Sequence, residues 1–126
     1  MDPRIRILLR IIDENGGALR VTVHEISGAL GIGEARLLRL FNREVGKTLR
    51  QYLLDVRMAR AALLLQNVAP PIKVVASNCG YREVTNFYRD FKRVHGISPM
   101  QMRRQHLDIQ FHSKEPAVAK SPILAT

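Results

Sequence analysis

The stretch "FKRVHG" at residues 91–96 repeats, with the same Phe, Arg and Gly, the phrase "FNREVG" found fifty positions earlier at residues 41–46. Around these phrases the offset of fifty pairs Arg39 with Arg89, Phe41 with Phe91, Arg43 with Arg93, Gly46 with Gly96, Thr48 with Ser98 and Gln51 with Gln101. Further upstream the offset is forty-nine, and it pairs Val23 with Ile72, Ile26 with Val75, Ser27 with Ala76 and Gly31 with Gly80. The chain therefore contains an internal duplication, with one residue inserted in the second copy.

Each copy has apolar residues at helical spacing, then a short turn that contains glycine, then a second helical segment. Thr22 and Glu25 form a capping-box pattern at the start of the first copy. No β-branched run of alternating polarity is bounded by turns, so we predict an all-α fold with two helix-turn-helix units. We expect the first unit at about 22–46, a linker helix at about 48–67, the second unit at about 71–96 and a final short helix at about 98–105.

The segments outside the duplication are simpler. Asp2 and Pro3 are a plausible N-cap and first turn for an opening helix that the glycine pair at residues 16–17 stops. Residues 108–126 have no sustained period and contain two prolines, so we expect a flexible tail after a domain of residues 1–107. A linker of about 19 residues would span roughly 28 Å. That length approaches the roughly 34 Å between successive major-groove faces of B-DNA.

The chain has 126 residues and a formal net charge of +9, which favours a polyanionic partner such as nucleic acid or an acidic membrane surface. Residues 108–126 hold as many acidic as basic groups, so the excess lies in the folded part. The single cysteine, Cys79, excludes an internal disulfide framework, and no apolar run follows a basic start as in a signal peptide. We therefore expect a cytoplasmic protein without a membrane span.

The sequence gives little support for a metal site, a redox-active cysteine or a phosphate-binding loop. His24, His95, His106 and His112 do not have the spacing of a metal site. Cys79 falls on the packed face of its helix, and the turn at residues 31–33 lacks the preceding strand that a phosphate-binding loop requires. We predict no catalytic site, no cofactor and no metal: the chain is not an enzyme.

The second helix of each unit has two different faces. At about 100° per residue, Leu37, Leu40 and Phe41 lie opposite Ala35, Leu38, Arg39 and Asn42, and Phe87, Phe91 and Val94 lie opposite Thr85, Tyr88, Arg89 and Lys92. An outward helix face with arginine suits the major groove, because guanidinium groups donate to guanine O6 and N7. Flanking residues that we expect to contact DNA phosphates are Arg36, Asn42, Arg43, Lys47, Arg82, Lys92 and Arg93.

The chain resembles the AraC/XylS-type transcription regulators from about residue 19 to residue 104. The strongest part is "VVASNCGYREVTNFYRDFKRVHGISPMQMRR" at 74–104, where the family pattern is met by Val75-Ala76, Gly80-Tyr81, Phe87, Phe91-Lys92, Gly96, Ser98-Pro99 and Arg103. The linker is also similar, at Tyr52, Leu53, Arg57, Ala61 and Leu64.

The resemblance implies a seven-helix domain whose two recognition helices enter adjacent major-groove segments near a bacterial promoter. It implies double-stranded DNA and RNA polymerase as partners, and activation more often than repression. By position, the base-reading residues are Ala35, Leu38 and Arg39 in the first unit, and Val84, Thr85, Tyr88 and Arg89 in the second. Ala35 and Leu38 are apolar where polar or aromatic readers often stand in the family, so we expect the first unit to read few bases.

Family members commonly carry a second domain for effector binding or dimerisation, which 126 residues do not accommodate. We expect such a domain to lie outside this chain, with a stand-alone regulator as the alternative. A different function also stays open: a basic helical module that binds RNA or an acidic protein partner without reading DNA sequence. RNA readers usually present aromatic platforms, and here only Tyr88 is expected on the outside.

Overall fold

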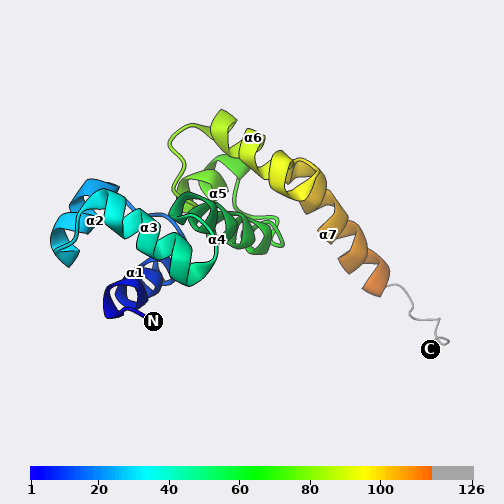
Figure 1. The fold of residues 1–126 in the computed structure, drawn as a ribbon. Helices are drawn as coiled ribbons and strands as arrows, with labels where there is room; N and C mark the ends of the chain where they lie inside the picture. Colours follow the sequence, from blue (N-terminus) through cyan, green and yellow to red (C-terminus); the bar gives the residue numbers. More distant parts are fainter. Residues whose placement is uncertain (115–126) are drawn as a thin grey trace, which may run out of the picture.

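A computed structural model of the chain describes residues 1–114, and these form helices without a strand. The helices are α1 (Pro3–Glu14), α2 (Val23–Leu30), α3 (Glu34–Val45), α4 (Leu49–Leu64), α5 (Ile72–Asn78), α6 (Val84–His95) and α7 (Pro99–Lys114). In Figure 1, α4 lies between the unit formed by α2 and α3 and the unit formed by α5 and α6. This arrangement confirms the predicted all-α fold with two helix-turn-helix units.

Side-chain caps explain where several helices begin. The Asp2 carboxylate accepts from the backbone N–H of Arg4, and Thr22 and Glu25 form a complete capping box. Thr48 caps α4, and Ser98 occupies the corresponding place before α7. These bonds satisfy backbone donors that the first turn of a helix leaves unpaired.

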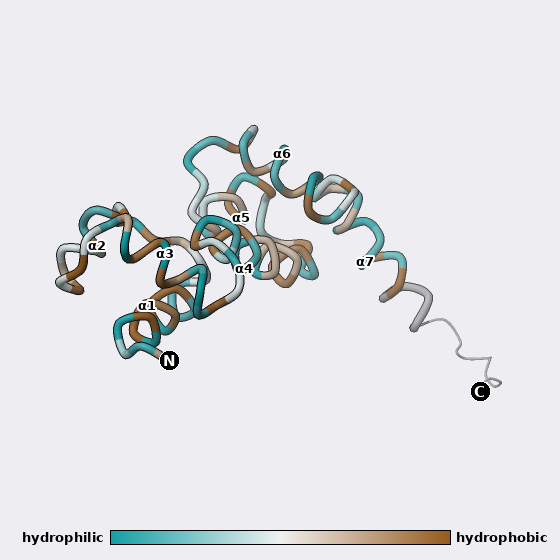
Figure 2. The backbone as a smooth tube through the Cα atoms, in the orientation of Figure 1, coloured by the Kyte–Doolittle hydropathy of each residue, from teal (hydrophilic) through white to brown (hydrophobic). Residues whose placement is uncertain are grey.

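Two hydrophobic cores share α4. The first core consists of Ile5, Leu8, Ile12, Ile32, Leu37, Leu40, Phe41 and Leu49. The second consists of Met58, Ala61, Leu65, Ile72, Val75, Ala76, Cys79, Phe87 and Phe91. The start of α4 thus belongs to the first core and its end to the second. Figure 2 shows apolar residues alternating with polar ones along α1 and α3, which contribute to the first core.

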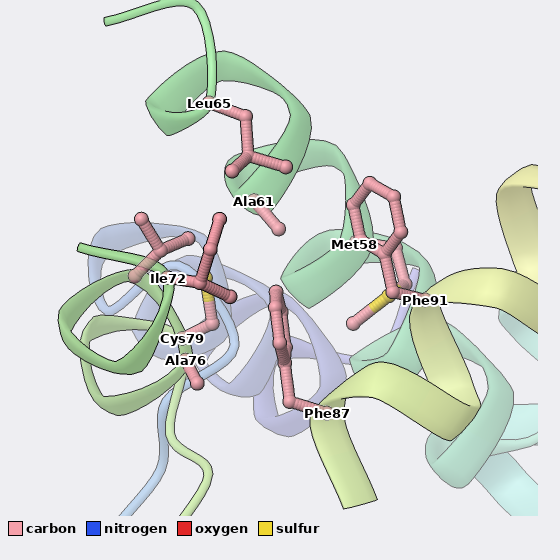
Figure 3. Close-up of a cluster of buried hydrophobic side chains, with 9 residues drawn as sticks. Met58, Ala61, Leu65, Ile72, Ala76, Cys79, Phe87 and Phe91 are labelled. Carbon is pink, nitrogen blue, oxygen red and sulfur yellow. The ribbon is translucent and has the colours of Figure 1, made fainter. Parts of the chain in front are cut away.

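The second core is built around two rings of α6. Phe87 and Phe91 are fully buried, with ring centroids 5.7 Å apart. Figure 3 shows both rings reaching from α6 toward side chains of α4, such as Met58, and toward Cys79, which directly follows α5. Burying one such ring stabilises the fold by roughly 1.5–3 kcal/mol, so the two rings anchor α6 to the second core.

The connection after α1 also touches the second unit. Arg57 of α4 donates from Nε to the carbonyl of Gly17 at 2.8 Å, and its guanidinium lies 5.6 Å from the centre of the Tyr81 ring. A Cβ built on Gly80 would lie 2.9 Å from the Cα of Ala18. The turn of the second unit is therefore packed directly against the segment between α1 and α2.

Three expectations were wrong in detail. The linker helix was predicted to reach residue 67, but α4 ends at Leu64. Beyond it the backbone N–H groups of Gln66 and Asn67 donate to the carbonyls three residues earlier, at Leu63 and Leu64, so the chain forms tight turns there and not α-helix. The last helix was predicted to end at about residue 105; α7 continues to Lys114, since no Gly or Pro interrupts residues 100–115. The other residues of the predicted tail, 115–126, lie outside the described residues.

The third correction concerns α6. We placed Val94 on the packed face with Phe87 and Phe91, but its side chain is 41% exposed. The last turn of α6 contacts α4 through the residue next to Val94, so Val94 itself is turned toward solvent. His95 fills the neighbouring position instead, with its ring 4.4 Å from that of Phe91 and Nε2 3.1 Å from the carbonyl of Met58.

The close approach at Gly80 has a matched control in Gly96, because both have a positive φ, +89° and +80°. An alanine at Gly96 meets nothing within 4 Å, whereas one at Gly80 collides with backbone. We expect Gly96→Ala to lower the free energy of unfolding by about 1–2 kcal/mol through the left-handed backbone alone. Gly80→Ala should cost about 1–3 kcal/mol more through overpacking. Urea unfolding followed by circular dichroism measures both; equal losses would contradict the packing against Ala18.

Candidate nucleic-acid interface

The second helix of each unit, α3 or α6, presents one buried and one exposed face. Leu37 and Phe41 of α3 are fully buried, as are Phe87 and Phe91 of α6. Both helices end at glycines, Gly46 and Gly96, that have left-handed backbone angles. The exposed faces are consequently displayed on two helices of the same length that are anchored in the same way.

The exposed face of α3 carries the predicted residues. Leu38 is 41% exposed, which is unusual for a leucine on a helix this well packed. The exposed residues named in the sequence analysis are Ala35, Arg36, Leu38, Arg39, Asn42 and Arg43. The helical-wheel assignment of this face therefore agrees with the structure, while the role of each residue toward DNA remains a prediction.

The exposed face of α6 agrees with the wheel except at its start. Val84 is half-buried and packs against the second core, so its side chain mainly covers the beginning of the helix. Tyr88 is 36% exposed, and its ring lies 6.2 Å from that of Phe87, which steadies it at the surface. The exposed predicted residues of this unit are Arg82, Thr85, Tyr88, Arg89, Lys92 and Arg93.

A carboxylate within α6 organises two of these arginines. Asp90 accepts from the hydroxyl of Tyr81 at 2.8 Å, and its other oxygen lies 3.3 Å from Nη2 of Arg93 and 3.5 Å from Nε of Arg89. The Asp90 side chain is only 15% exposed. Burial raises the pKa of Tyr81, and the hydrogen bond to Asp90 raises it further, so the phenol stays protonated and keeps donating.

Lys47 and the arginines of α3 also have carboxylates nearby. Nζ of Lys47 lies 2.7 Å from Asp55, and this hydrogen bond lowers the pKa of Asp55. The two side chains are 45% and 38% exposed, so the pair adds at most about 1 kcal/mol of stability and is open to exchange with a phosphate.

The three arginines of α3 border a groove of about 360 Å³ next to the start of α1. Its lining residues are Asp2, Arg4, Arg36, Arg39, Leu40, Arg43 and Glu44. The backbone N–H of Asp2 donates to Glu44 at 2.8 Å, and the Arg4 side chain holds the pKa of Asp2 down to about 2. The first unit therefore has two carboxylates beside its basic groups, supplied partly by a helix far away in the sequence.

Sequence reasoning missed two basic residues, Arg20 and Lys73, that the fold brings beside the predicted Arg82 of the second unit. A pocket at its turn is lined by Arg20, Lys73 and Arg82, together with Glu83 and uncharged neighbours. Arg20 comes from the connection between α1 and α2, which no local pattern places there. Lys73 pairs with His24 in the duplication, a position that was not predicted to contact DNA, so the repeat gave no signal for it.

Cys79 is fully buried, and burial raises the pKa of its thiol to about 11, so the reactive thiolate is disfavoured. Across residues 1–114 no three His, Cys, Asp or Glu side chains gather as metal ligands would. None of the helices in that range combines the length and apolar character needed to cross a bilayer.

Comparison with known families decides what these two units are. A family model described as "Helix-turn-helix domain" matches residues 26–105, which run from within α2 into α7 and include the linker helix and the whole second unit. The chain belongs to the AraC/XylS-type family of DNA-binding domains. The AraC/XylS-type resemblance is thereby confirmed, and with it the expectation of a DNA-binding domain of the kind found in transcription regulators.

Individual relatives agree with this assignment. The arabinose operon regulatory protein of Salmonella typhimurium is 28% identical over 103 residues, which are 82% of this chain and 37% of that protein. The C-terminal domain of AraT, a response regulator from Geobacillus stearothermophilus, matches with a TM-score of 0.76 at 29% identity, over 82% of this chain and 86% of that one. The DNA-binding domain of AdpA, solved with a target DNA, shares the fold with a TM-score of 0.78 at 22% identity, over 87% and 97% of the two chains. The AraC/XylS-type domain spans about a third of the length of the curated relatives it matches.

The bond between Tyr81 and Asp90 can be tested by Tyr81→Phe, with Tyr52→Phe as a matched control. Tyr52 also donates to an aspartate, Asp13, but at 3.1 Å and at an exposed site. We expect Tyr81→Phe to lower the free energy of unfolding by about 1 kcal/mol and Tyr52→Phe by less. Equal effects in urea unfolding would show that Asp90 does not depend on this donor.

The same bond predicts a pH dependence. Because the pKa of Tyr81 is raised in the folded state above its ordinary value of 10.0, the unfolded chain loses this proton first as pH rises. Its contribution to stability is complete below pH 10 and declines above it. The wild-type protein should therefore lose more stability between pH 9 and about pH 11 than Tyr81→Phe does.

Proposed function

We propose that the domain binds double-stranded DNA sequence-specifically by placing α3 and α6 in successive segments of one major groove. The carrying observation is that one helix, α4, belongs to the cores of both units while each unit exposes an equivalent arginine, Arg39 or Arg89. The 16 residues of α4 span about 24 Å, which together with the width of the flanking helices suits a groove repeat of about 34 Å. The likeness to the AdpA domain, solved with its target DNA, supports the proposal.

Arg39 and Arg89 are the principal base readers in this proposal. Each presents a guanidinium whose paired donors fit guanine O6 and N7. Thr85 and Tyr88 add hydroxyl groups on α6, while Ala35 and Leu38 offer only apolar contact to thymine methyl groups on α3. Val84 covers the helix start and contributes at most one methyl contact. The second unit should accordingly specify more bases than the first.

The remaining basic and amide side chains are proposed to hold the DNA backbone. They fall on both sides of the two reading faces: Arg36, Asn42, Arg43, Lys47, Arg82, Lys92 and Arg93. Such contacts neutralise phosphates and carry little sequence information. The domain of residues 1–107 would thus combine a sequence-independent grip with two short reading surfaces.

As part of a bacterial transcription regulator, the domain would act in the cytoplasm, next to promoters, as an activator that contacts RNA polymerase. An effector-binding or dimerisation domain outside this chain is the expected second partner, since the matched region is only about a third of the length of the curated relatives. An RNA-binding module is less compatible with the fold, because Phe41, Phe87 and Phe91 are fully buried and unavailable for stacking on bases.

The reading roles predict distinct effects of substitution. We expect Arg39→Ala and Arg89→Ala to weaken binding to the selected site by about 1–3 kcal/mol each, with relaxed preference at one base pair. The site is obtained by selection from a random duplex library, and affinities are measured on that site and on random duplexes. If Arg89→Ala weakened both kinds of duplex equally, Arg89 would not read a base.

The phosphate role predicts a different pattern for Arg93→Ala. This change should weaken all duplexes alike and reduce the slope of log affinity against log salt by about one. Titrations at several salt concentrations measure the slope, with Arg10→Ala on the exposed side of α1 as a control of equal charge. A change in sequence preference without a change in slope would argue that Arg93 reads bases instead.

A further inference from the structure

A polar cleft of about 560 Å³ lies between the start of α4 and the middle of α6. Its lining residues are Thr48, Arg50, Gln51, Leu54, Arg57, Arg89, Asp90 and Arg93. Residues 48–57 of this lining belong to α4 and its N-cap, which follow the first unit. Arg89, Asp90 and Arg93 belong to α6, the recognition helix of the second unit. The cleft therefore marks the junction between the two halves of the domain.

The charge of this cleft is positive. Four arginines line it, and Asp90 is the single carboxylate among its lining residues. The Asp90 oxygens already accept from Tyr81 and Arg93. One carboxylate cannot balance four guanidinium groups, so the cleft is suited to a further anion.

The arginines differ in how firmly they are held. Arg57 is half-buried and tied to the carbonyl of Gly17, so it is a fixed charge at the back of the cleft. Arg50 lies in the first turn of α4 and is exposed. Within residues 1–109, no salt bridge joins Arg50 to a carboxylate. Its guanidinium is therefore available to a ligand, at a helix end whose dipole also favours an anion.

The position of the cleft indicates which anion it meets. If α3 and α6 occupy successive segments of the major groove, the sugar–phosphate strands that flank the intervening minor groove must pass between them. The cleft lies between the two units and has Arg89, a proposed reader, as one of its lining residues. We propose that it binds a backbone phosphate of the DNA between the two base-reading contacts, with Arg50 as the principal ligand.

This inference rests on the proposed function, because it requires both recognition helices on one duplex. It adds a phosphate site that bridges the two units and is independent of base sequence. The internal duplication does not predict this phosphate site, because the residue equivalent to Arg50 in the second copy is Met100. The bridge would exist only once in the domain, at its centre.

The experiment combines Arg50→Ala with neutral phosphates in the DNA. The selected duplex is prepared with single methylphosphonate substitutions at each position between the two half-motifs, and affinities are measured for wild type, Arg50→Ala and Arg10→Ala. We expect one or two central substitutions to weaken wild-type binding about tenfold, as loss of a charge-assisted hydrogen bond implies. The same substitutions should have little further effect on Arg50→Ala, whereas Arg10→Ala should respond as wild type does.

The outcomes separate the two proposals. If wild type shows no preference for any duplex, the proposed function fails. If it selects a site but no central methylphosphonate matters, or if Arg50→Ala and wild type respond equally, the phosphate site fails while DNA reading stands. Circular dichroism spectra and unfolding curves of both variants establish that each is folded. Inorganic phosphate at millimolar concentration should compete weakly and equally with all duplexes, which distinguishes a free-anion site from one that needs the DNA backbone.

Discussion

The whole domain depends on α4 belonging to two cores at once. Leu49 packs with the first unit, and Met58, Ala61 and Leu65 pack with the second. Because a helix is stiff over 16 residues, burying both of its ends fixes the separation of the units. The buried residues of each unit pack against residues of this helix, so the spacing of the two exposed faces follows from the same burial that stabilises the fold.

A second set of contacts restricts how the units turn about α4. Arg57 joins the carbonyl of Gly17 to the face of the Tyr81 ring, and Gly80 lies against Ala18. These residues belong to the connection after α1, to α4 and to the turn of the second unit. The orientation of α6 is thereby tied to the segment that precedes the first unit, so these contacts favour a single reading surface over two independent ones.

The sequence predicted the architecture well because duplication made each pattern visible twice. Pairs such as Phe41 with Phe91 and Gly46 with Gly96 located both recognition helices and their buried faces. The predictions that failed concerned helix ends or contacts between segments that are distant in the sequence. Val94 was assigned to the core by period alone, α7 continued where no residue stopped it, and Arg50 lacked a basic counterpart in the other copy. The groove that brings Asp2 beside the arginines of α3 is likewise a product of tertiary packing, which spacing along the chain does not encode.

One difference between the two copies affects the entropy of binding. The places taken by Tyr81 and Asp90 in the second unit are held in the first by Ile32 and Leu40, both buried in the core. Arg89 and Arg93 therefore lie next to the Asp90 carboxylate of their own helix, whereas Arg39 and Arg43 have no carboxylate at the matching position. Side chains that are already restrained lose less rotational freedom when a ligand immobilises them. We therefore expect that immobilising Arg89 and Arg93 against a ligand costs less entropy than immobilising Arg39 and Arg43.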